Sequence, residues 1–213
     1  MSSDVLVTTP AQRQTEPHAE AVSRNRRQQA TFRKVLAAAM ATLREKSYAD
    51  LTVRLVAARA KVAPATAYTY FSSKNHLIAE VYLDLVRQVP CVTDVNVPMP
   101  IRVTSSLRHL ALVVADEPEI GAACTAALLD GGADPARRAV RDRIGAEIHR
   151  RITSAIGPGA DPGTVFALEM AFFGALVQAG SGTFTYHEIA DRLGYVVGLI
   201  LAGANEPSTG GSE

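Results

Sequence analysis

The chain has 213 residues, of which 47% are hydrophobic, so it can bury a core and is not disordered throughout. Residues 1–88 carry 13 Lys and Arg against 7 Asp and Glu, whereas residues 89–213 carry 9 against 14, so a net charge of +1 conceals parts with net charges of +6 and −5. This asymmetry indicates that the first part contacts a polyanion, although a solvated basic face on a small helical domain would give the same count.

Apolar residues recur at helical spacing in about nine segments, and no alternating strand pattern of useful length is present, so the predicted fold class is all-α. The first 22 residues are polar, contain two prolines and predict a disordered tail, and residues 206–213 predict a second flexible tail. Prolines and a loss of periodicity after residue 89 mark a boundary between two modules, 23–89 and 101–205, where the charge also reverses. The predicted helices cover residues 25–46, 52–60, 65–71, 73–89, 101–115, 118–129, 135–156, 164–180 and 186–204.

The segment 51–77 has the spacing of a helix-turn-helix. Val56 and Ala60 lie one turn apart on its first helix, and the turn follows them. Ala67 and Phe71 predict the buried face of its second helix. Pro64 fits the first turn of that helix, where a missing N–H costs nothing.

The opposite face of this second helix has the composition of a DNA-reading surface. At about 100° per residue, Ala65, Thr66 and Thr69 lie opposite the buried face, and Tyr68 and Tyr70 lie on its two flanks. Small residues and hydroxyl groups can meet base edges, and phenol groups can reach phosphates. Two tyrosines beside an apolar helix are more often packing residues, but here the basic charge, the turn spacing and the flank geometry coincide.

The run resembles the signature of the tetracycline-repressor (TetR) family, and the match covers about the first 88 residues. In that signature a supporting helix T-x-R-x-[IV]-A leads to a recognition helix ending Y-x-[YH]-F, and S-K-x-x-L begins the fourth helix. The resemblance implies a DNA-binding transcriptional regulator in which Tyr68, Tyr70 and Lys74 contact phosphates and exposed recognition-helix residues read bases. The matching residues are Thr52, Arg54, Val56, Ala57, Tyr68, Tyr70, Phe71, Ser73, Lys74 and Leu77.

Two residues depart from the family pattern, and a basic stretch precedes the first predicted helix. Lys61 stands where the family usually has glycine. Ala63 stands where a serine or threonine often caps the recognition helix, and the missing cap lowers the stability of that helix by about 1 kcal/mol. Arg24, Arg26 and Arg27 either follow phosphates as a basic arm or are merely solvated. The residues predicted to contact DNA are Arg26, Arg27, Thr52, Arg54, Pro64, Ala65, Thr66, Tyr68, Thr69, Tyr70 and Lys74.

The last two predicted helices are apolar on nearly all sides. A single chain of this size cannot bury all of that apolar surface, so these helices predict a partner. The resemblance implies that they form a four-helix bundle in a homodimer, which would hold two recognition helices about 34–36 Å apart on a palindromic double-stranded DNA operator. It also implies a repressor released by a small-molecule effector bound among the helices of residues 101–205. A hydrophobic or amphipathic effector is expected, because the candidate pocket residues are Leu107, Leu110, Val114, Cys124, Leu128, Phe166, Glu169, Met170, Phe173 and Val177, which otherwise are simply core.

The spacing of the two cysteines is not that of a zinc site or a disulfide framework, and no metal or other cofactor is expected. The amino terminus lacks the features of a signal peptide, and no apolar run approaches the length needed to span a bilayer, which predicts a cytoplasmic protein without membrane contact. No catalytic or phosphate-binding motif supports an enzyme. A DNA-binding architectural protein without an effector site, or a transcriptional activator, remains an alternative to the repressor.

Overall fold

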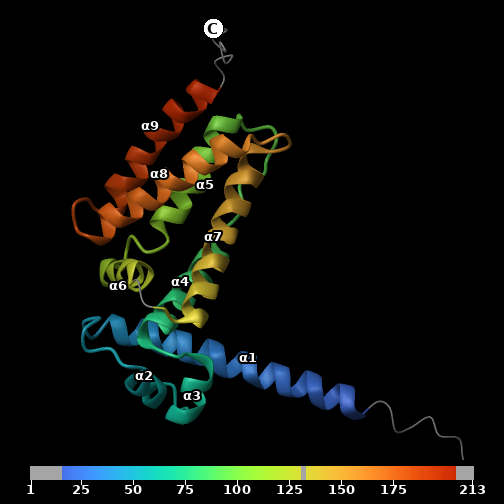
Figure 1. Cartoon of the computed structure of the whole chain (residues 1–213), viewed down its shortest axis with the longest axis vertical. Helices are drawn as coiled ribbons and strands as arrows, with labels where there is room; N and C mark the ends of the chain where they lie inside the picture. The colour runs from blue at the N-terminus through green and yellow to red at the C-terminus, as the bar shows by residue number, and fades with distance from the viewer. Residues whose placement is uncertain (1–15, 131–132, 205–213) are drawn as a thin grey trace, which may run out of the picture.

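Nine α-helices and no strand are present in the described residues, so the predicted all-α class is confirmed (Figure 1). The structure is a computed structural model that describes residues 16–130 and 133–204, with the backbone alone for residues 16–24. Apart from the start of the first helix, each helix end lies within three residues of its predicted position. The helices are α1 (Glu16–Leu43), α2 (Val53–Arg59), α3 (Pro64–Tyr70), α4 (Lys74–Gln88), α5 (Met99–Leu112), α6 (Pro118–Leu129), α7 (Pro135–Ile156), α8 (Pro162–Gly180) and α9 (Tyr186–Ala204).

The amino-terminal module consists of α1, α2 and α3. α2 packs against both α1 and α3. Phe71, which caps the end of α3, stacks on Phe32 of α1 with the ring centroids 5.1 Å apart, and Val56 of α2 and Ala67 of α3 are fully buried beside them. This shared burial holds two seven-residue helices that are too short to be stable alone.

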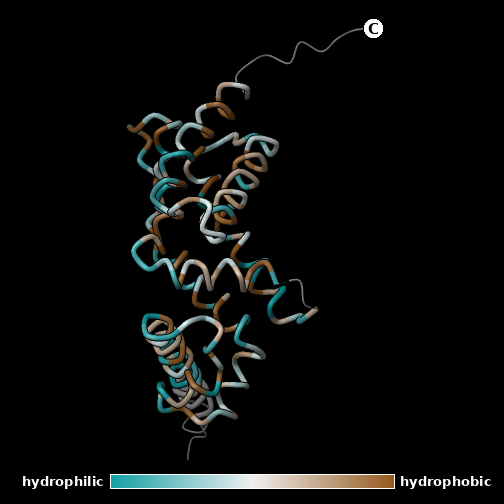
Figure 2. Tube along the Cα trace, turned by 90° about the vertical axis from the view of Figure 1, so that its left-hand side faces the viewer, coloured by the Kyte–Doolittle hydropathy of each residue, from teal (hydrophilic) through white to brown (hydrophobic). Residues whose placement is uncertain are grey.

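The carboxyl-terminal module consists of α5, α7, α8 and α9, with α6 crossing between it and the first module (Figure 1). α5 packs along α9 and α7, and α8 packs against α9 and α6. α4 belongs to both modules, because it contacts α1 at one end and α6 and α7 further along. The view in Figure 2, turned by 90°, shows the two modules one above the other. α4 and α6 therefore form the connection between them.

The prediction of a disordered tail over residues 1–22 is wrong for its last part. α1 begins at Glu16 and continues as one helix to Leu43, so it projects well beyond the rest of the first module (Figure 1). The extension lacks apolar periodicity, but alanine, glutamate and arginine favour helix, and Pro17 lies in the first turn, where proline is tolerated. Residues 1–15 and 205–213, which include the rest of both predicted tails, lie outside the described residues.

The linker between α4 and α5 contains no helix, as its prolines predict, and arginines attach it to the second module. Arg151 of α7 donates a hydrogen bond to the carbonyl of Val89 at 2.8 Å. Arg102 of α5 donates to the carbonyl of Val97 at 2.6 Å and to that of Ala155 at 2.8 Å. These guanidinium groups fix the path of the linker against α7.

Within the described residues, α8 is the single helix long and apolar enough to cross a membrane by length and composition. The prediction that no segment approaches this length is therefore wrong. α8 packs against α6, α7 and α9 and buries Leu168 and Phe172 on its inner side. A core helix of a soluble protein has the same composition, so this property does not assign α8 to a membrane.

Candidate functional site

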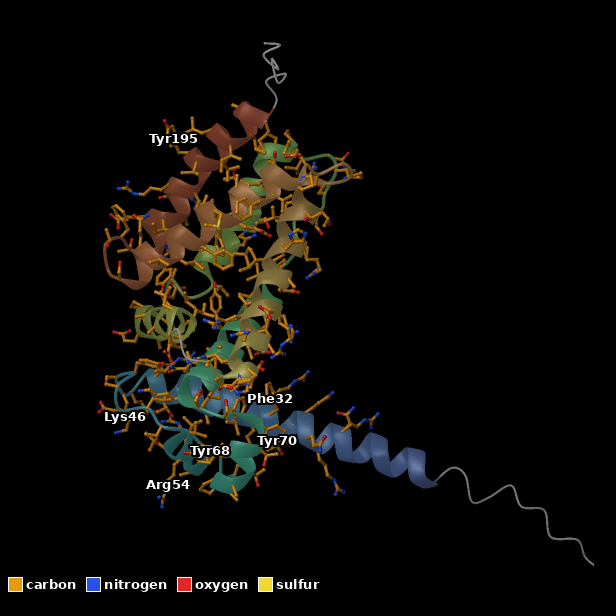
Figure 3. The ribbon with its side chains drawn as sticks, viewed as in Figure 1. Phe32, Lys46, Arg54, Tyr68, Tyr70 and Tyr195 are labelled. Atoms are coloured by element: carbon orange, nitrogen blue, oxygen red, sulfur yellow. The ribbon has the colours of Figure 1, made fainter. Side chains whose placement is uncertain are left out.

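The recognition helix α3 presents a ridge to solvent, as the sequence predicts. Ala67 on its inner side is fully buried, whereas Ala65, Thr66 and Thr69 on the opposite side are exposed. Tyr68 is 52% exposed. Figure 3 shows Tyr68 at the end of the molecule formed by α2 and α3. Small side chains and hydroxyl groups therefore face outward, with a phenol beside them.

Tyr70 is half-buried, on the flank of α3 that faces α1. Its ring meets Phe32 edge to face, with centroids 6.1 Å apart (Figure 3). This contact orients the phenol along the groove between α3 and α1. Tyr70 therefore combines a packing role with a hydroxyl group near the outer surface.

The turn between α2 and α3 accommodates both departures from the family pattern. Lys61 has a φ of 53°, the left-handed conformation that glycine usually supplies. The amide of Val62 donates to the carbonyl of Ala57 at 2.9 Å, which closes the end of α2 as a left-handed residue allows. Ala63 gives α3 no side-chain cap, and Pro64 occupies the first turn of that helix.

Two of the signature residues lie at the start of α2. The hydroxyl of Thr52 caps this helix by accepting a hydrogen bond from the amide of Leu55 at 3.1 Å. Arg54 is exposed and forms no hydrogen bond or ion pair with another described residue. In Figure 3 it lies at the same end of the molecule as Tyr68. Its guanidinium is therefore available to an external anion.

Lys74 begins α4 and is partly engaged within the protein. Its Nζ donates to the carbonyl of Tyr48 at 3.1 Å and to that of Ala49 at 3.5 Å, and lies 4.5 Å from the centroid of the Tyr48 ring. An ammonium group has three N–H donors, so one remains for a phosphate. Lys74 therefore fixes the loop between α1 and α2 as well as carrying charge to this surface.

Arg26 and Arg27 do not form an arm that precedes the first helix. Both lie inside α1 and are exposed on the part of the helix that projects beyond the module. The backbone around Arg24 is helical too. A basic stretch on a helix has a fixed direction, unlike an arm that precedes the helix.

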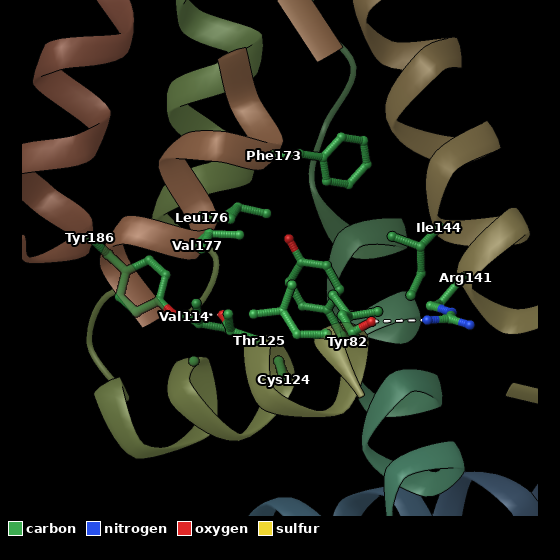
Figure 4. Close-up of a pocket in the computed structure, with 13 residues that line it drawn as sticks. Tyr82, Val114, Cys124, Thr125, Arg141, Ile144, Phe173, Leu176, Val177 and Tyr186 are labelled. Carbon is green, nitrogen blue, oxygen red and sulfur yellow. Dashed lines mark hydrogen bonds between the residues drawn. The ribbon is translucent and has the colours of Figure 1, made fainter. Parts of the chain in front are cut away.

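A pocket lies in the second module, between α4, α6, α7 and α8, and Tyr186 at the start of α9 closes one side (Figure 4). Its volume is about 250 Å³, and apolar side chains supply most of its surface. The lining residues are Tyr82, Val114, Gly121, Cys124, Thr125, Leu128, Leu129, Arg141, Ile144, Phe173, Leu176, Val177 and Tyr186.

The polar groups of this pocket are few and mostly neutral. Tyr82 is 2% exposed, and its hydroxyl forms no hydrogen bond with any described residue. Burial raises the pKa of Tyr82 well above its ordinary value and that of Cys124 to about 12, so both stay protonated at neutral pH. The hydroxyls of Thr125 and Tyr186 lie 3.5 Å apart. Arg141 is the one charged side chain among the lining residues.

Polar contacts tie the end of α6, next to this pocket, to the helix-turn-helix. Asn75 in the first turn of α4 accepts a hydrogen bond from the hydroxyl of Tyr48 and donates one to the carboxylate of Asp130, which follows α6. Asp134, at the start of α7, accepts a hydrogen bond from the hydroxyl of Ser72, which lies between α3 and α4. Residues at the two ends of the segment between α6 and α7 therefore contact the loop that follows the recognition helix and the first turn of α4.

Comparison with known proteins supports the family suggested by the motif. Residues 35–81 match the family model of bacterial regulatory proteins, tetR family. The helix-turn-helix module is a TetR-family DNA-binding domain. This family consists of bacterial regulatory proteins, and the matched residues run from α1 through the first half of α4.

Solved structures similar to this chain extend the likeness of the fold to the second module. A TetR transcriptional regulator from Rhodococcus sp. RHA1 is 22% identical with a TM-score of 0.70, and the match covers 85% of this chain and 99% of that one. FadR from Thermus thermophilus, a TetR-family repressor in complex with lauroyl-CoA, is 18% identical with a TM-score of 0.60, covering 85% and 99%. FadR from Bacillus subtilis, in complex with stearoyl-CoA, is 14% identical with a TM-score of 0.55, covering 81% and 98%. At these identities the likeness shows the fold.

The structure places the predicted pocket residues in four different environments. Leu107 and Leu110 are fully buried in the core of the second module, away from the pocket. Phe166 and Met170 are exposed on the outer side of α8 and do not line this pocket. Glu169 accepts a hydrogen bond from His149 Nδ1 at 2.8 Å and does not line the pocket either. The five that do line it are Val114, Cys124, Leu128, Phe173 and Val177.

Sequence reasoning missed the polar lining residues Tyr82, Thr125, Arg141 and Tyr186. Tyr82 and Tyr186 stand at positions where an apolar residue would suit the helix pattern, and they were not separated from ordinary core. Arg141 lies in a helix rich in charged residues, whose sequence pattern is typical of a solvated face. No group of three or more metal-ligating side chains occurs in the part of the chain that the structure describes.

Proposed function

We propose that this TetR-family regulator is a homodimeric repressor that leaves its operator when a small ligand fills the pocket. The main support is the outward ridge of α3, where Thr66 and Thr69 face solvent beside Tyr68. A helix with small and hydroxyl side chains on its outer face fits the major groove, where such groups meet base edges and thymine methyl groups.

The proposed roles of the individual residues follow from their positions. Residues on the ridge read bases, and residues on its flanks, at the start of α2, at the start of α4 and on α1 contact phosphates, which set affinity without setting sequence. Thr52 and Pro64 bring backbone amides of α2 and α3 toward the DNA. We assign base reading to Ala65, Thr66 and Thr69, and phosphate contacts to Arg26, Arg27, Thr52, Arg54, Pro64, Tyr68, Tyr70 and Lys74.

Dimerisation is proposed through α8 and α9. Tyr195 of α9 is 73% exposed (Figure 3), and Phe166 of α8 is 62% exposed. Met170 and Leu199 are exposed on the same two helices. Large apolar side chains grouped on an exposed face favour an interface, and a two-fold dimer buries the same patch on both subunits. The two copies of α3 would then meet half-sites about 34–36 Å apart on a palindromic operator in the cytoplasm.

Ligand control is proposed through α4 and α6, which line the pocket and reach the helix-turn-helix. A ligand that displaces Leu128 or Leu129 moves the end of α6, which is tied to Asn75 through Asp130. Any such movement shifts the two recognition helices relative to each other. This scheme makes residues 23–89 the DNA-binding domain and residues 101–205 the effector and dimerisation domain.

The proposal is tested by selecting sequences that bind the purified full-length protein from a random DNA library. We expect an inverted repeat whose half-sites are about one helical turn apart, bound by a dimer in analytical ultracentrifugation. A non-symmetric site bound by a monomer contradicts the dimer. An architectural protein without an effector would instead bind DNA with little sequence preference, and no ligand would change its affinity.

A further inference from the structure

The size of the pocket limits what it can enclose. An apolar cavity of about 150 Å³ accepts benzene, so a cavity of about 250 Å³ encloses an apolar body of about ten non-hydrogen atoms. The lining of Phe173, Leu176, Ile144 and Val114 suits an aromatic or short aliphatic body. Larger parts of a ligand would have to remain outside.

The hydroxyl of Tyr82 defines one polar feature of the ligand. Figure 4 shows the Tyr82 ring in the middle of the pocket, with its hydroxyl pointing toward α8. A buried hydroxyl without a hydrogen-bond partner is unfavourable, and a ligand oxygen that accepts its proton removes this cost. Because burial keeps Tyr82 protonated, this group acts as a donor. The enclosed body of the ligand should therefore carry a carbonyl or hydroxyl oxygen.

Arg141 defines the second polar feature. It lies at the end of the pocket opposite Tyr186 (Figure 4), and its Nη1 donates to the carbonyl of Leu128 at 3.2 Å. It forms no ion pair with a carboxylate of any described residue. The other polar lining groups are neutral, so the pocket favours an anion at this end. One guanidinium that is already shared with backbone carbonyls balances a single negative charge, which favours a carboxylate over a phosphate dianion.

We propose that the pocket binds a small monocarboxylate whose apolar body carries one carbonyl or hydroxyl oxygen, with the carboxylate on Arg141 and that oxygen accepting a hydrogen bond from Tyr82. The assignment of this ligand as the signal that releases DNA rests on the proposed function, whereas the binding of the ligand does not. Binding to the pocket can be measured without DNA.

The test uses isothermal titration calorimetry of the full chain with three matched probes. 4-Oxo-4-phenylbutanoate has both polar features, 4-phenylbutanoate lacks the keto oxygen, and 4-oxo-4-phenylbutanamide lacks the charge. We expect the keto acid to bind about tenfold tighter than either analogue. Equal affinity for the two acids overturns the role of Tyr82, and equal affinity for acid and amide overturns that of Arg141. No binding of any probe at millimolar concentration overturns the ligand class.

Variants assign the two preferences to the two residues. Tyr82→Phe removes only a hydroxyl without a partner, so it should fold normally and bind both acids with the affinity that the parent has for 4-phenylbutanoate. Arg141→Gln should abolish the preference for acid over amide. Arg138→Gln, an exposed change on the same helix as Arg141, is the matched control and should leave all three affinities unchanged. If Tyr82→Phe still prefers the keto acid to 4-phenylbutanoate, or Arg141→Gln still prefers the acid to the amide, the assignment is contradicted.

Release of DNA is then measured separately by fluorescence anisotropy on a selected sequence. If the keto acid binds as expected and does not lower DNA affinity, the ligand class stands and the proposed regulation fails. If the protein does not bind DNA but the calorimetry follows the pattern above, the proposed function fails and the pocket assignment stands.

Discussion

Gly121 of α6 should not tolerate a methyl group, because the ring of Tyr186 lies against it. A Cβ built at Gly121 would lie 2.5 Å from Tyr186 Cε2 and 2.6 Å from Cζ and the hydroxyl oxygen, where ordinary contacts begin at 3.4 Å. The ring, which is almost fully buried, would have to move by about 1 Å into the pocket. Overpacking of this kind costs about 1–3 kcal/mol.

The matched control is Gly145→Ala on α7, where a Cβ meets nothing within 4 Å. Replacing a helical glycine with alanine stabilises by about 1 kcal/mol, and both positions receive this gain. We therefore expect Gly121→Ala to be less stable than Gly145→Ala by about 1–3 kcal/mol in urea denaturation, with each kcal/mol corresponding to about 2–4 °C in Tm.

Measuring the same substitutions in a Tyr186→Leu background tests whether the contact with Tyr186 is the cause. Tyr186→Leu removes the three contacting atoms and keeps an apolar side chain, so in that background Gly121→Ala and Gly145→Ala should stabilise equally. Gly121→Ala in the parent should also weaken binding of pocket ligands. If it stabilises the parent as much as Gly145→Ala does, the position of Tyr186 as a wall of the pocket is refuted.

Four further predictions concern other parts of the molecule. Lys61→Gly should be more stable than Lys61→Ala by about 1 kcal/mol in urea denaturation, because φ is 53° there, and equal stabilities would contradict the left-handed turn. Arg150 and a second arginine hold the pKa of Glu147 at about 2, below its ordinary 4.5, so the stability that this carboxylate contributes is complete above about pH 4.5 and is lost as the pH falls toward 2. In acid titrations followed by circular dichroism, Glu147→Gln should lack this part of the loss of stability at low pH. A titration curve identical to that of the parent would contradict the role of Glu147. Leu199→Lys should yield monomers in sedimentation at micromolar concentration, whereas a persistent dimer would place the interface elsewhere. Lys74→Ala should weaken binding to all DNA sequences and flatten the salt dependence, and unchanged affinity at low salt would exclude the phosphate contact.

The helix-turn-helix could be predicted from the sequence almost completely, because its signals are local. The burial of Ala67 and Phe71 follows from helical spacing alone, and so does the exposure of Thr66 and Thr69. The family's usual glycine at the position of Lys61 left open a left-handed backbone or a different turn, and the structure has the left-handed backbone. The start of α1 could not be predicted in this way, because its first turns are set by helix propensity and have no buried face to reveal them.

The pocket was only partly predictable, since the pattern of a helix does not separate a residue that lines a cavity from one in the core. Leu107 and Leu110 have the same spacing as Val114, yet only Val114 reaches the pocket. Tertiary packing also turns Arg141 toward the end of α6, although the charged sequence of α7 gives no sign that this residue faces inward. The sequence predicts a partner for α8 and α9, but helical spacing alone does not show which side of α8 faces it, so Phe166 and Met170 were predicted to line the pocket.

Base preference measured position by position tests the central claim most directly. Sequences are selected in parallel with the parent, with Thr66→Val and with Thr69→Val, which keep the shape of the side chain and remove its hydroxyl. Thr183→Val, an exposed change far along the chain, serves as the control. The account predicts that each α3 variant changes the preferred base at one or two symmetric positions and retains its affinity for nonspecific DNA, whereas the control selects the parent sequence. An unchanged preference in both α3 variants would mean that the ridge of α3 does not read the DNA.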